Sequence, residues 1–147
     1  MTTTEAVVIT APGQVALQTV TLKTPGPDDV VVQTVYTSIS TERMLLAGQM
    51  PHPMLSLPVV PGYETVGQVI ETGANVDPAW RGRWVYVGGA LCYEGVNAAW
   101  GGQAATLFTH VQRVTSLDGM DPKTGVLLAL AATALHGIDR LNPTPGQ

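Results

Sequence analysis

A phenol and a carboxylate stand side by side in the stretch PGYETVGQVIETG, at Tyr63 and Glu64. Pro61-Gly62 before them is a turn signal, and the residues after them predict a strand over 65–71. The two side chains therefore stand at the mouth of a strand. A tyrosine hydroxyl can hold a substrate oxygen or pass on a proton, and a carboxylate can orient such a group. The plainer interpretations are packing for Tyr63 and structural hydrogen bonding for Glu64.

The other reactive side chains are few. His136 lies in an apolar stretch, and an imidazole titrates near neutral pH, so it is a candidate proton relay; a satisfied core or interface histidine is the alternative. His52 and His110 are expected at the surface. Cys92 is the one cysteine, which excludes an internal disulfide and a multi-cysteine zinc site. We expect its thiol to be buried and inert.

The scaffold for these groups is predicted to be mostly strands up to residue 115. Short β-branched or alternating runs between Gly and Pro turns predict strands over 6–10, 15–22, 30–39, 65–71, 84–87 and 104–114. A short helix is expected over 41–48, followed by an oily, proline-rich loop over 49–61. Many short strands with such turns favour a small barrel or sandwich.

One long helix is predicted near the end of the chain. Asp121 and Pro122 are typical of an N-cap and a first helical residue, and the apolar pattern runs to about Leu141. A helix that is apolar nearly all round needs cover on more than one side. We therefore expect 1–122 to form a domain, and 123–147 to form a helix and linker toward a missing partner domain. If this helix is left uncovered, we expect it to associate with another copy, giving a dimer or other homo-oligomer.

Composition narrows the function classes. The chain has 147 residues, is 45% hydrophobic and 12% charged, and carries a net charge of −4. This suits one globular domain with a core, and the lack of a basic run predicts no nucleic-acid partner. The longest apolar run, 125–138, is shorter than the about 20 residues that span a bilayer, and no leader pattern precedes it. We expect a cytoplasmic protein without a membrane span.

Five motifs, in order, resemble the catalytic domain of the medium-chain dehydrogenase/reductases. They are APGQ at 11–14, PGPDDVVV at 25–32, PGYETVGQV at 61–69, RGRWV at 81–85 and GGQAA at 101–105. The resemblance implies a mainly β (α+β) fold, a GroES-like barrel with short helices and a C-terminal helix. In that family a Rossmann domain follows. No Gly-x-Gly-x-x-Gly follows a strand here, so we expect NAD to be bound mainly by that further domain.

A closer resemblance, to the branch of this family that oxidises bacteriochlorophyllides, rests on three stretches. They are SISTERMLLAGQMP at 38–51, PVVPGYE at 58–64 and LALAATALH at 128–136. The resemblance implies a bacteriochlorophyllide substrate whose 1-hydroxyethyl group is oxidised to acetyl with NAD, within bacteriochlorophyll biosynthesis. Contact with a photosynthetic membrane would then be peripheral.

The resemblance also implies that no zinc is used. Zinc members of the family carry Gly-His-Glu where this chain has Gly62-Tyr63-Glu64, and a zinc cysteine near the position of Ser40. Their third ligand falls near 131–132, where this chain has two alanines. A catalytic zinc site needs about three N, S or O ligands, and the soft ligands are missing here.

Hydroxyl groups stand where the metal would be. In this interpretation Tyr63 holds the substrate oxygen, and Ser40, Thr41 or Glu42 starts a proton relay to solvent. The bacteriochlorophyllide branch usually carries a Gly-Thr pair before this glutamate. The pair is missing from Ser40-Thr41-Glu42, so the residue that begins the relay stays open. A cap for the following helix is the plainer role of Ser40 and Thr41.

A flat, wide, apolar chlorin needs pliable apolar walls. Met44, Met50 and Met54 could supply them, because methionine is flexible and polarizable, and Tyr93 and Trp100 could stack on the ring. Ordinary core packing under a long loop is the alternative.

Other roles and functions stay open at this point. Arg81 and Arg83 could meet a substrate carboxylate or simply lie on a turn. The chain could also belong to a zinc-free quinone reductase, or act as a stand-alone GroES-like binding module.

Overall fold

A long hairpin opens the chain. In the computed structural model, which describes residues 2–40, 42–49 and 56–141, β1 (Thr3–Ala11) pairs antiparallel with β2 (Gln14–Leu22). Gly13 takes a φ of +74° in the turn between them, a conformation that glycine adopts without steric cost. The strands predicted over 6–10 and 15–22 are therefore confirmed, and they form a hairpin.

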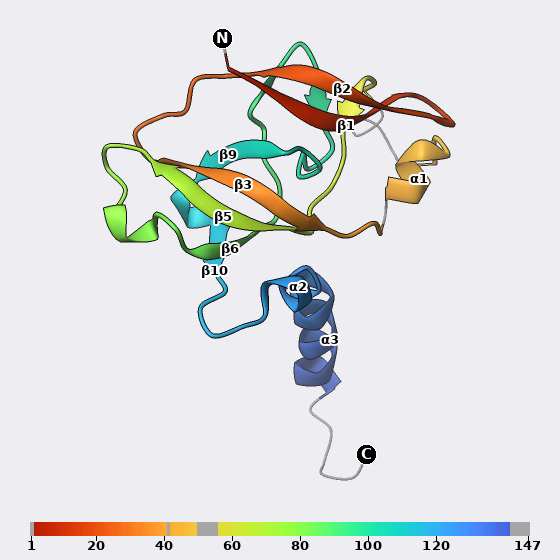
Figure 1. The fold of residues 1–147 in the computed structure, drawn as a ribbon. Coiled ribbons are helices and arrows are strands. Elements are labelled where there is room, and N and C mark those ends of the chain that lie inside the picture. The colour runs from red at the N-terminus through yellow and green to blue at the C-terminus, as the bar shows by residue number, and fades with distance from the viewer. Residues whose placement is uncertain (1, 41, 50–55, 142–147) are drawn as a thin grey trace.

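The hairpin belongs to the first of two five-stranded sheets, with the order β7-β2-β1-β4-β8. The other three strands of this sheet have two residues each: β4 (Val59–Val60), β7 (Tyr93–Glu94) and β8 (Asn97–Ala98). β4 lies in the stretch predicted as a proline-rich loop, and β7 and β8 lie in the glycine-rich stretch 88–102, outside the predicted strands. Figure 1 shows this sheet around β1 and β2 at the top of the molecule.

The second sheet has the order β10-β6-β5-β3-β9 and is antiparallel throughout. Its strands are β3 (Asp29–Thr37), β5 (Thr65–Thr72), β6 (Trp84–Val87), β9 (Thr106–His110) and β10 (Val114–Ser116). The predicted strand over 104–114 is broken, because the His110 side chain accepts a hydrogen bond from the Gln112 amide and caps the 3-10 turn η2 (Val111–Arg113).

The two sheets enclose a core of valines and leucines. Val8 from the first sheet, and Val30, Val32, Val85 and Leu107 from the second, are fully buried in one cluster. Main-chain hydrogen bonds join the sheets where the Val7 amide donates to the Gln103 carbonyl at 2.9 Å. The curled sheets and few helices confirm the mainly β fold.

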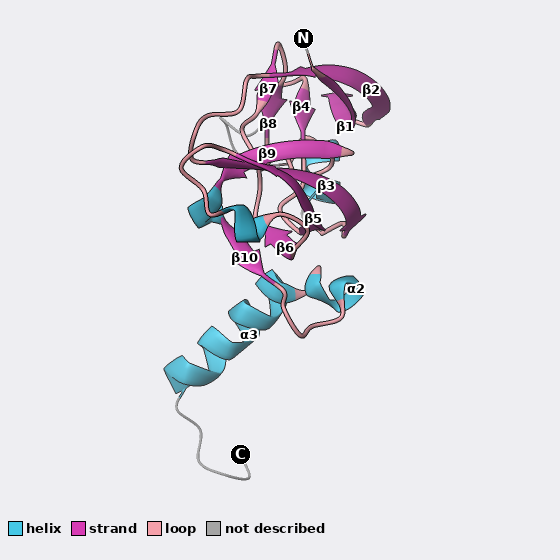
Figure 2. Ribbon diagram, turned by 60° about the vertical axis from the view of Figure 1, so that its left-hand side comes forward, coloured by secondary structure: helices cyan, strands magenta, loops and turns pink. Residues whose placement is uncertain are grey.

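Three short helical segments lie on the barrel: α1 (Glu42–Leu46), the 3-10 turn η1 (Pro78–Trp80) and α2 (Pro122–Gly125). Asp121 caps α2 by accepting a hydrogen bond from the Lys123 amide at 3.1 Å, as predicted. The predicted long helix is broken after Gly125 and resumes as α3 (Leu128–Leu141). Figure 2 shows α3 extending away from both sheets, and no residue of α3 is buried.

Candidate active site

A tight turn between β4 and β5 sets the direction of Tyr63. Gly62 has a φ of +102°, and a Cβ there would lie 2.6 Å from Cγ of Gln103. The Gln103 amide donates to the Pro61 carbonyl at 2.9 Å, and the Gly102 amide donates to the Gly62 carbonyl at 2.7 Å. Only glycine fits a turn held this closely against a second segment. Tyr63 therefore leaves the turn from a fixed backbone.

The Tyr63 hydroxyl donates a hydrogen bond to Oγ of Ser40 at 3.2 Å. Ser40 lies between β3 and α1, so two distant parts of the chain bring these hydroxyls together. The Tyr63 ring also packs edge-to-face against Trp100, with the centroids 5.0 Å apart and the planes at 60°. Both partners of the hydroxyl pair are half-buried, which leaves them open to a ligand.

Glu64 is held in a different way. Its side chain is only 1% exposed, and its Oε2 accepts a hydrogen bond from the Ser38 hydroxyl. Within the described residues, Oε1 is buried without a hydrogen-bond partner. A buried carboxylate with so few partners is costly and is uncommon outside functional sites. Sequence reasoning missed Ser38; its position two residues before Ser40, at the end of a predicted strand, was the available signal.

Glu42 is also buried, at 5% exposure, and its carboxylate is occupied by structural contacts. Oε2 accepts from the Ser40 amide at 2.6 Å, and Oε1 accepts from Nε2 of Gln103 at 3.4 Å. The same Gln103 nitrogen lies 3.3 Å from the Ser38 carbonyl oxygen. Gln103 thus ties both segments of the site together. Its signal in the sequence was the GGQAA motif, which carries the family resemblance.

Tyr86, on β6, holds the backbone of Tyr63 in place. Its hydroxyl donates to the Tyr63 carbonyl oxygen at 2.7 Å. Burial raises the pKa of Tyr86 to about 12, and the nearby Glu64 carboxylate and Tyr63 add to the rise. The hydroxyl therefore stays protonated, as a donor, through the neutral range.

Each of two cavities is lined by one residue that contacts Tyr63. One, of about 490 Å³, is lined by Ser40, Arg43 and Met44, so the predicted relay and apolar-wall residues share it. The other, of about 330 Å³, is lined in part by Trp100. Tyr63 contacts Ser40 of the first cavity and Trp100 of the second.

The remaining predicted residues lie elsewhere. Tyr93 is 4% exposed, donates its hydroxyl to the Gly101 carbonyl oxygen at 2.5 Å, and lines a cavity together with Lys23 and Leu91. Its stacking role stays a prediction. His136 is exposed on α3, the helix that extends from the barrel, and is in none of the contacts that form the site. Thr41, Met50 and Met54 lie outside the described residues.

The donor groups described around Tyr63 are hydroxyls and carboxylates. Within the described ranges, no group of three or more His, Cys, Asp or Glu side chains could hold a metal. Cys92, the one thiol, is buried in the core, and burial raises its pKa and so favours the neutral form. Around Ser40 and Tyr63 the donors are hydroxyls and two carboxylates that already accept hydrogen bonds.

The arrangement matches a known class of domain. Residues 26–120 match the alcohol dehydrogenase GroES-like domain, and the chain belongs to that family, within the medium-chain dehydrogenase/reductase superfamily. In the part of the chain that the structure describes, no helix is long and apolar enough to cross a membrane.

Two relatives are more specific. The chain is 38% identical over 148 residues to 2-desacetyl-2-hydroxyethyl bacteriochlorophyllide A dehydrogenase of Cereibacter sphaeroides, covering 95% of this chain and 46% of the relative. It is 39% identical over 140 residues to the protein of the same name from Rhodobacter capsulatus, covering 92% of this chain and 44% of that protein. The chain therefore spans less than half the length of these relatives.

A solved structure shows the same fold. It is described as a zinc-binding dehydrogenase of Sinorhizobium meliloti bound to NADP, and it aligns with a TM-score of 0.76 at 26% identity, covering 95% of this chain and 46% of that chain. The two relatives are named as dehydrogenases, and the solved structure is a dehydrogenase bound to NADP.

Proposed function

We propose that this chain is the substrate-binding and catalytic half of an NAD-dependent alcohol dehydrogenase that works without zinc. Its substrate would be a bacteriochlorophyllide, whose hydroxyethyl group becomes an acetyl group. The observation that carries the proposal is the hydrogen bond between Tyr63 and Ser40, at the place where the zinc members have metal ligands. The names of the two relatives, which match more than nine-tenths of the chain, support the substrate.

Alcohol oxidation removes a hydride from carbon and a proton from oxygen. A bound nicotinamide supplies the hydride acceptor. The chain must hold the alcohol oxygen and lead its proton away. Tyr63 and Ser40 present two hydroxyls 3.2 Å apart, and an alcohol oxygen that contacts both would have a donor and an acceptor at once.

The proton has a short way out. Tyr63 donates to Ser40, so a proton taken up by the phenol side can be handed on along this bond. Ser40 lines the cavity of about 490 Å³, through which its own hydroxyl proton can reach solvent. Glu42 is less suited to this relay than Ser40, because its two oxygens accept from the Ser40 amide and from Gln103.

The zinc-free part of the proposal rests on the donor set. Tetrahedral zinc is held by thiolate, imidazole or carboxylate groups. The nearest carboxylate in sequence to Tyr63 is Glu64, which is buried and bonded to Ser38. Hydroxyls make weak ligands for zinc but good hydrogen-bond partners for an alcohol.

We propose further that residues 1–122 are the catalytic domain, and that 123–147 lead toward a nucleotide-binding domain. Exposed Leu135 and Ile138 on α3 support this, since such side chains are normally covered in a complete protein. The relatives are more than twice as long as this chain, which leaves room for such a domain in them.

The test uses the protein that carries this chain together with its nucleotide-binding domain. NADH formation is measured with a hydroxyethyl chlorin, and quinone reduction is measured in parallel. We expect turnover of the chlorin, and a loss in kcat of about 10²-fold for Tyr63→Phe and for Ser40→Ala. Tyr36→Phe, on an exposed tyrosine of β3, is the matched control and should keep the full rate.

Three results would count against the proposal. Reduction of quinones without oxidation of the chlorin would place the protein in another branch of the superfamily. Full activity of Tyr63→Phe would show that the reaction does not need the Tyr63 hydroxyl. Stoichiometric zinc in an active preparation, lost together with activity on chelation, would contradict the zinc-free part.

A further inference from the structure

The proton relay proposed above does not involve the cavity next to Trp100. Two segments, 88–91 and 98–100, line it with glycines and alanines beside Leu91 and Trp100, and Arg113 also lines it. Its volume is about 330 Å³, which takes one edge of a large planar ligand but not the whole ring. No acidic side chain is among the described residues that line it.

The walls of this cavity are held rigidly. The Ala90 amide donates to the Trp100 carbonyl oxygen at 2.5 Å, and a Cβ at Gly89 would lie 2.4 Å from that same oxygen. Trp100 has a φ of +68°, unusual for a bulky residue. A backbone held in such a conformation costs free energy, and these positions gather at ligand sites. The indole is therefore set in place against Tyr63 before any ligand arrives.

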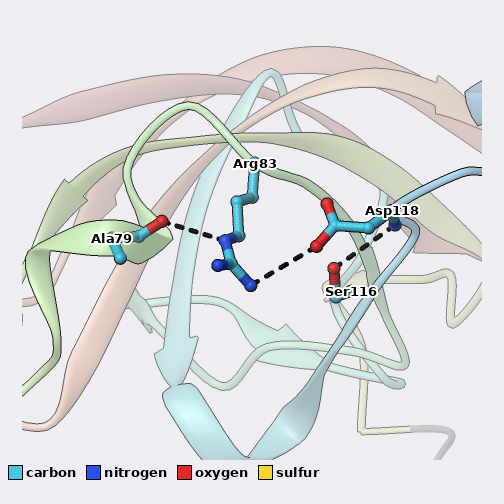
Figure 3. Close-up of polar contacts among 4 residues, drawn as sticks. All are labelled: Ala79, Arg83, Ser116 and Asp118. Atoms are coloured by element: carbon cyan, nitrogen blue, oxygen red, sulfur yellow. Dashed lines mark hydrogen bonds and ion pairs between the residues drawn. The ribbon is translucent and has the colours of Figure 1, made fainter.

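Among the described residues that line this cavity, Arg113 is the one with a positive charge. Within residues 2–40, 42–49 and 56–141 it forms no ion pair, and its side chain is exposed. Arg83, which the sequence offered as a carboxylate contact, lies 3.4 Å from the Asp118 carboxylate and donates to the Ala79 carbonyl oxygen (Figure 3). Its guanidinium also lies over the Trp80 ring. Arg81 lines none of the cavities beside Tyr63.

We propose that this cavity binds a carboxylate carried by a planar aromatic ligand, with Arg113 pairing with the carboxylate and Trp100 contacting the ring. This inference deepens the proposed function and rests on it, because a chlorophyllide carries a free acid group where a chlorophyll carries an ester. Arginine can bind a carboxylate through two parallel hydrogen bonds, which fixes the orientation of the ligand. With its acid at Arg113, the ring extends past Trp100 toward the Tyr63 hydroxyl.

The test compares acid and neutral forms of one ligand on the protein that contains this chain and its nucleotide-binding domain. Dissociation constants are measured for a hydroxyethyl chlorin with one free carboxylate and for its methyl ester. We expect the wild type to bind the acid about tenfold more tightly than the ester, since a charge-assisted pair contributes on this order. Arg113→Met should bind both forms equally, with the affinity for the ester unchanged. Arg81→Met, the matched control, should keep the preference.

A second pair of probes separates this inference from the proposed function. Pyrenecarboxylate and pyrenemethanol differ in the same charge but are not chlorins. If neither chlorin binds, but pyrenecarboxylate is preferred in the wild type and not in Arg113→Met, the carboxylate site stands and the chlorin substrate fails. If the chlorin is oxidised but acid and ester bind equally, the inference is overturned and the function stands. Loss of the preference in Arg43→Met instead of Arg113→Met also overturns it.

Discussion

Tyr63 is anchored at both its backbone and its hydroxyl. Tyr86 donates to its carbonyl oxygen, and its own hydroxyl donates to Ser40. The first contact has no chemistry of its own, yet it decides where the second can form. Replacing a residue that positions another through the backbone should therefore change the free energy of unfolding as well as the activity.

The raised pKa of Tyr86 gives a pH-dependent contribution to stability. In the unfolded chain this hydroxyl ionises near its ordinary value of 10, and in the folded protein near 12. The folded state therefore prefers the protonated form, so the contribution is complete below pH 10 and is lost as the pH rises toward 12. We expect the free energy of unfolding to fall over this range by an amount of about 1–2 kcal/mol that Tyr86→Phe no longer shows.

Urea unfolding at several pH values measures this slope. Tyr86→Phe should be about 1 kcal/mol less stable at neutral pH, because it lacks the bond to Tyr63, yet flatter above pH 10. Tyr36→Phe, at a tyrosine that is 39% exposed, should keep the wild-type slope. Equal slopes for all three proteins would rule out the buried Tyr86 hydroxyl as the cause.

At the residue scale, the sequence predicted a role for Tyr63 and left Ser40, Thr41 and Glu42 open as the start of the relay, and it did not predict the residues that support them. Tyr63 and Ser40 follow from their positions in the family motifs, and their contact is present. Ser38 and Gln103 were missed, because their contacts join residues 26 and 61 positions apart and depend on how the two segments lie side by side. A single sequence carries no sign of such pairing.

At the scale of elements, the turn at Gly62 does more for the site than any strand. It directs Tyr63, and its backbone is held to 102–103 by two hydrogen bonds. Gly13, in the first hairpin, also has a positive φ, but a Cβ there would meet nothing within 4 Å. Substituting each glycine by alanine therefore distinguishes the cost of the left-handed conformation alone, at Gly13, from that cost plus a steric clash, at Gly62.

We expect Gly13→Ala to lower the free energy of unfolding by about 1 kcal/mol, which is the cost of the left-handed conformation alone. Gly62→Ala should cost about 2–4 kcal/mol, because its Cβ would also press on Gln103. Chemical denaturation measures both. Similar losses for the two variants would mean that the Gln103 side chain moves aside freely, and that the turn does not fix Tyr63.

The sequence predicted elements best where they are long. The strand over 84–87 is found with the same bounds, and the β1–β2 hairpin is close to its prediction. The two-residue strands β4, β7 and β8 have too little sequence to show a period; they form because neighbouring strands offer free backbone groups. The break between α2 and α3 was missed, since the apolar residues continue through it.

At the scale of the whole molecule, α3 stands out because it packs on so little. Leu135 and Ile138 are 58% and 53% exposed, and Leu141 is 81% exposed. The barrel, by contrast, encloses its own core. These exposures mean that the barrel leaves most of the apolar side of α3 uncovered. The fold does not show which surface covers α3 in the whole protein. We therefore consider residues 1–147 prepared alone.

We expect residues 1–147 alone to associate through α3, because burying apolar side chains from two copies is favourable at about 25 cal/mol per Å². Leu135→Glu combined with Ile138→Glu, one turn apart on the same face, should weaken association at least tenfold. Leu17→Glu is the matched control, since Leu17 is 68% exposed but lies on β2. Sedimentation equilibrium gives the dissociation constants, and circular dichroism checks that α3 stays helical. A wild-type chain that is monomeric at high concentration would contradict the prediction, and so would an equal effect of Leu17→Glu, which would move the contact from α3 to the hairpin.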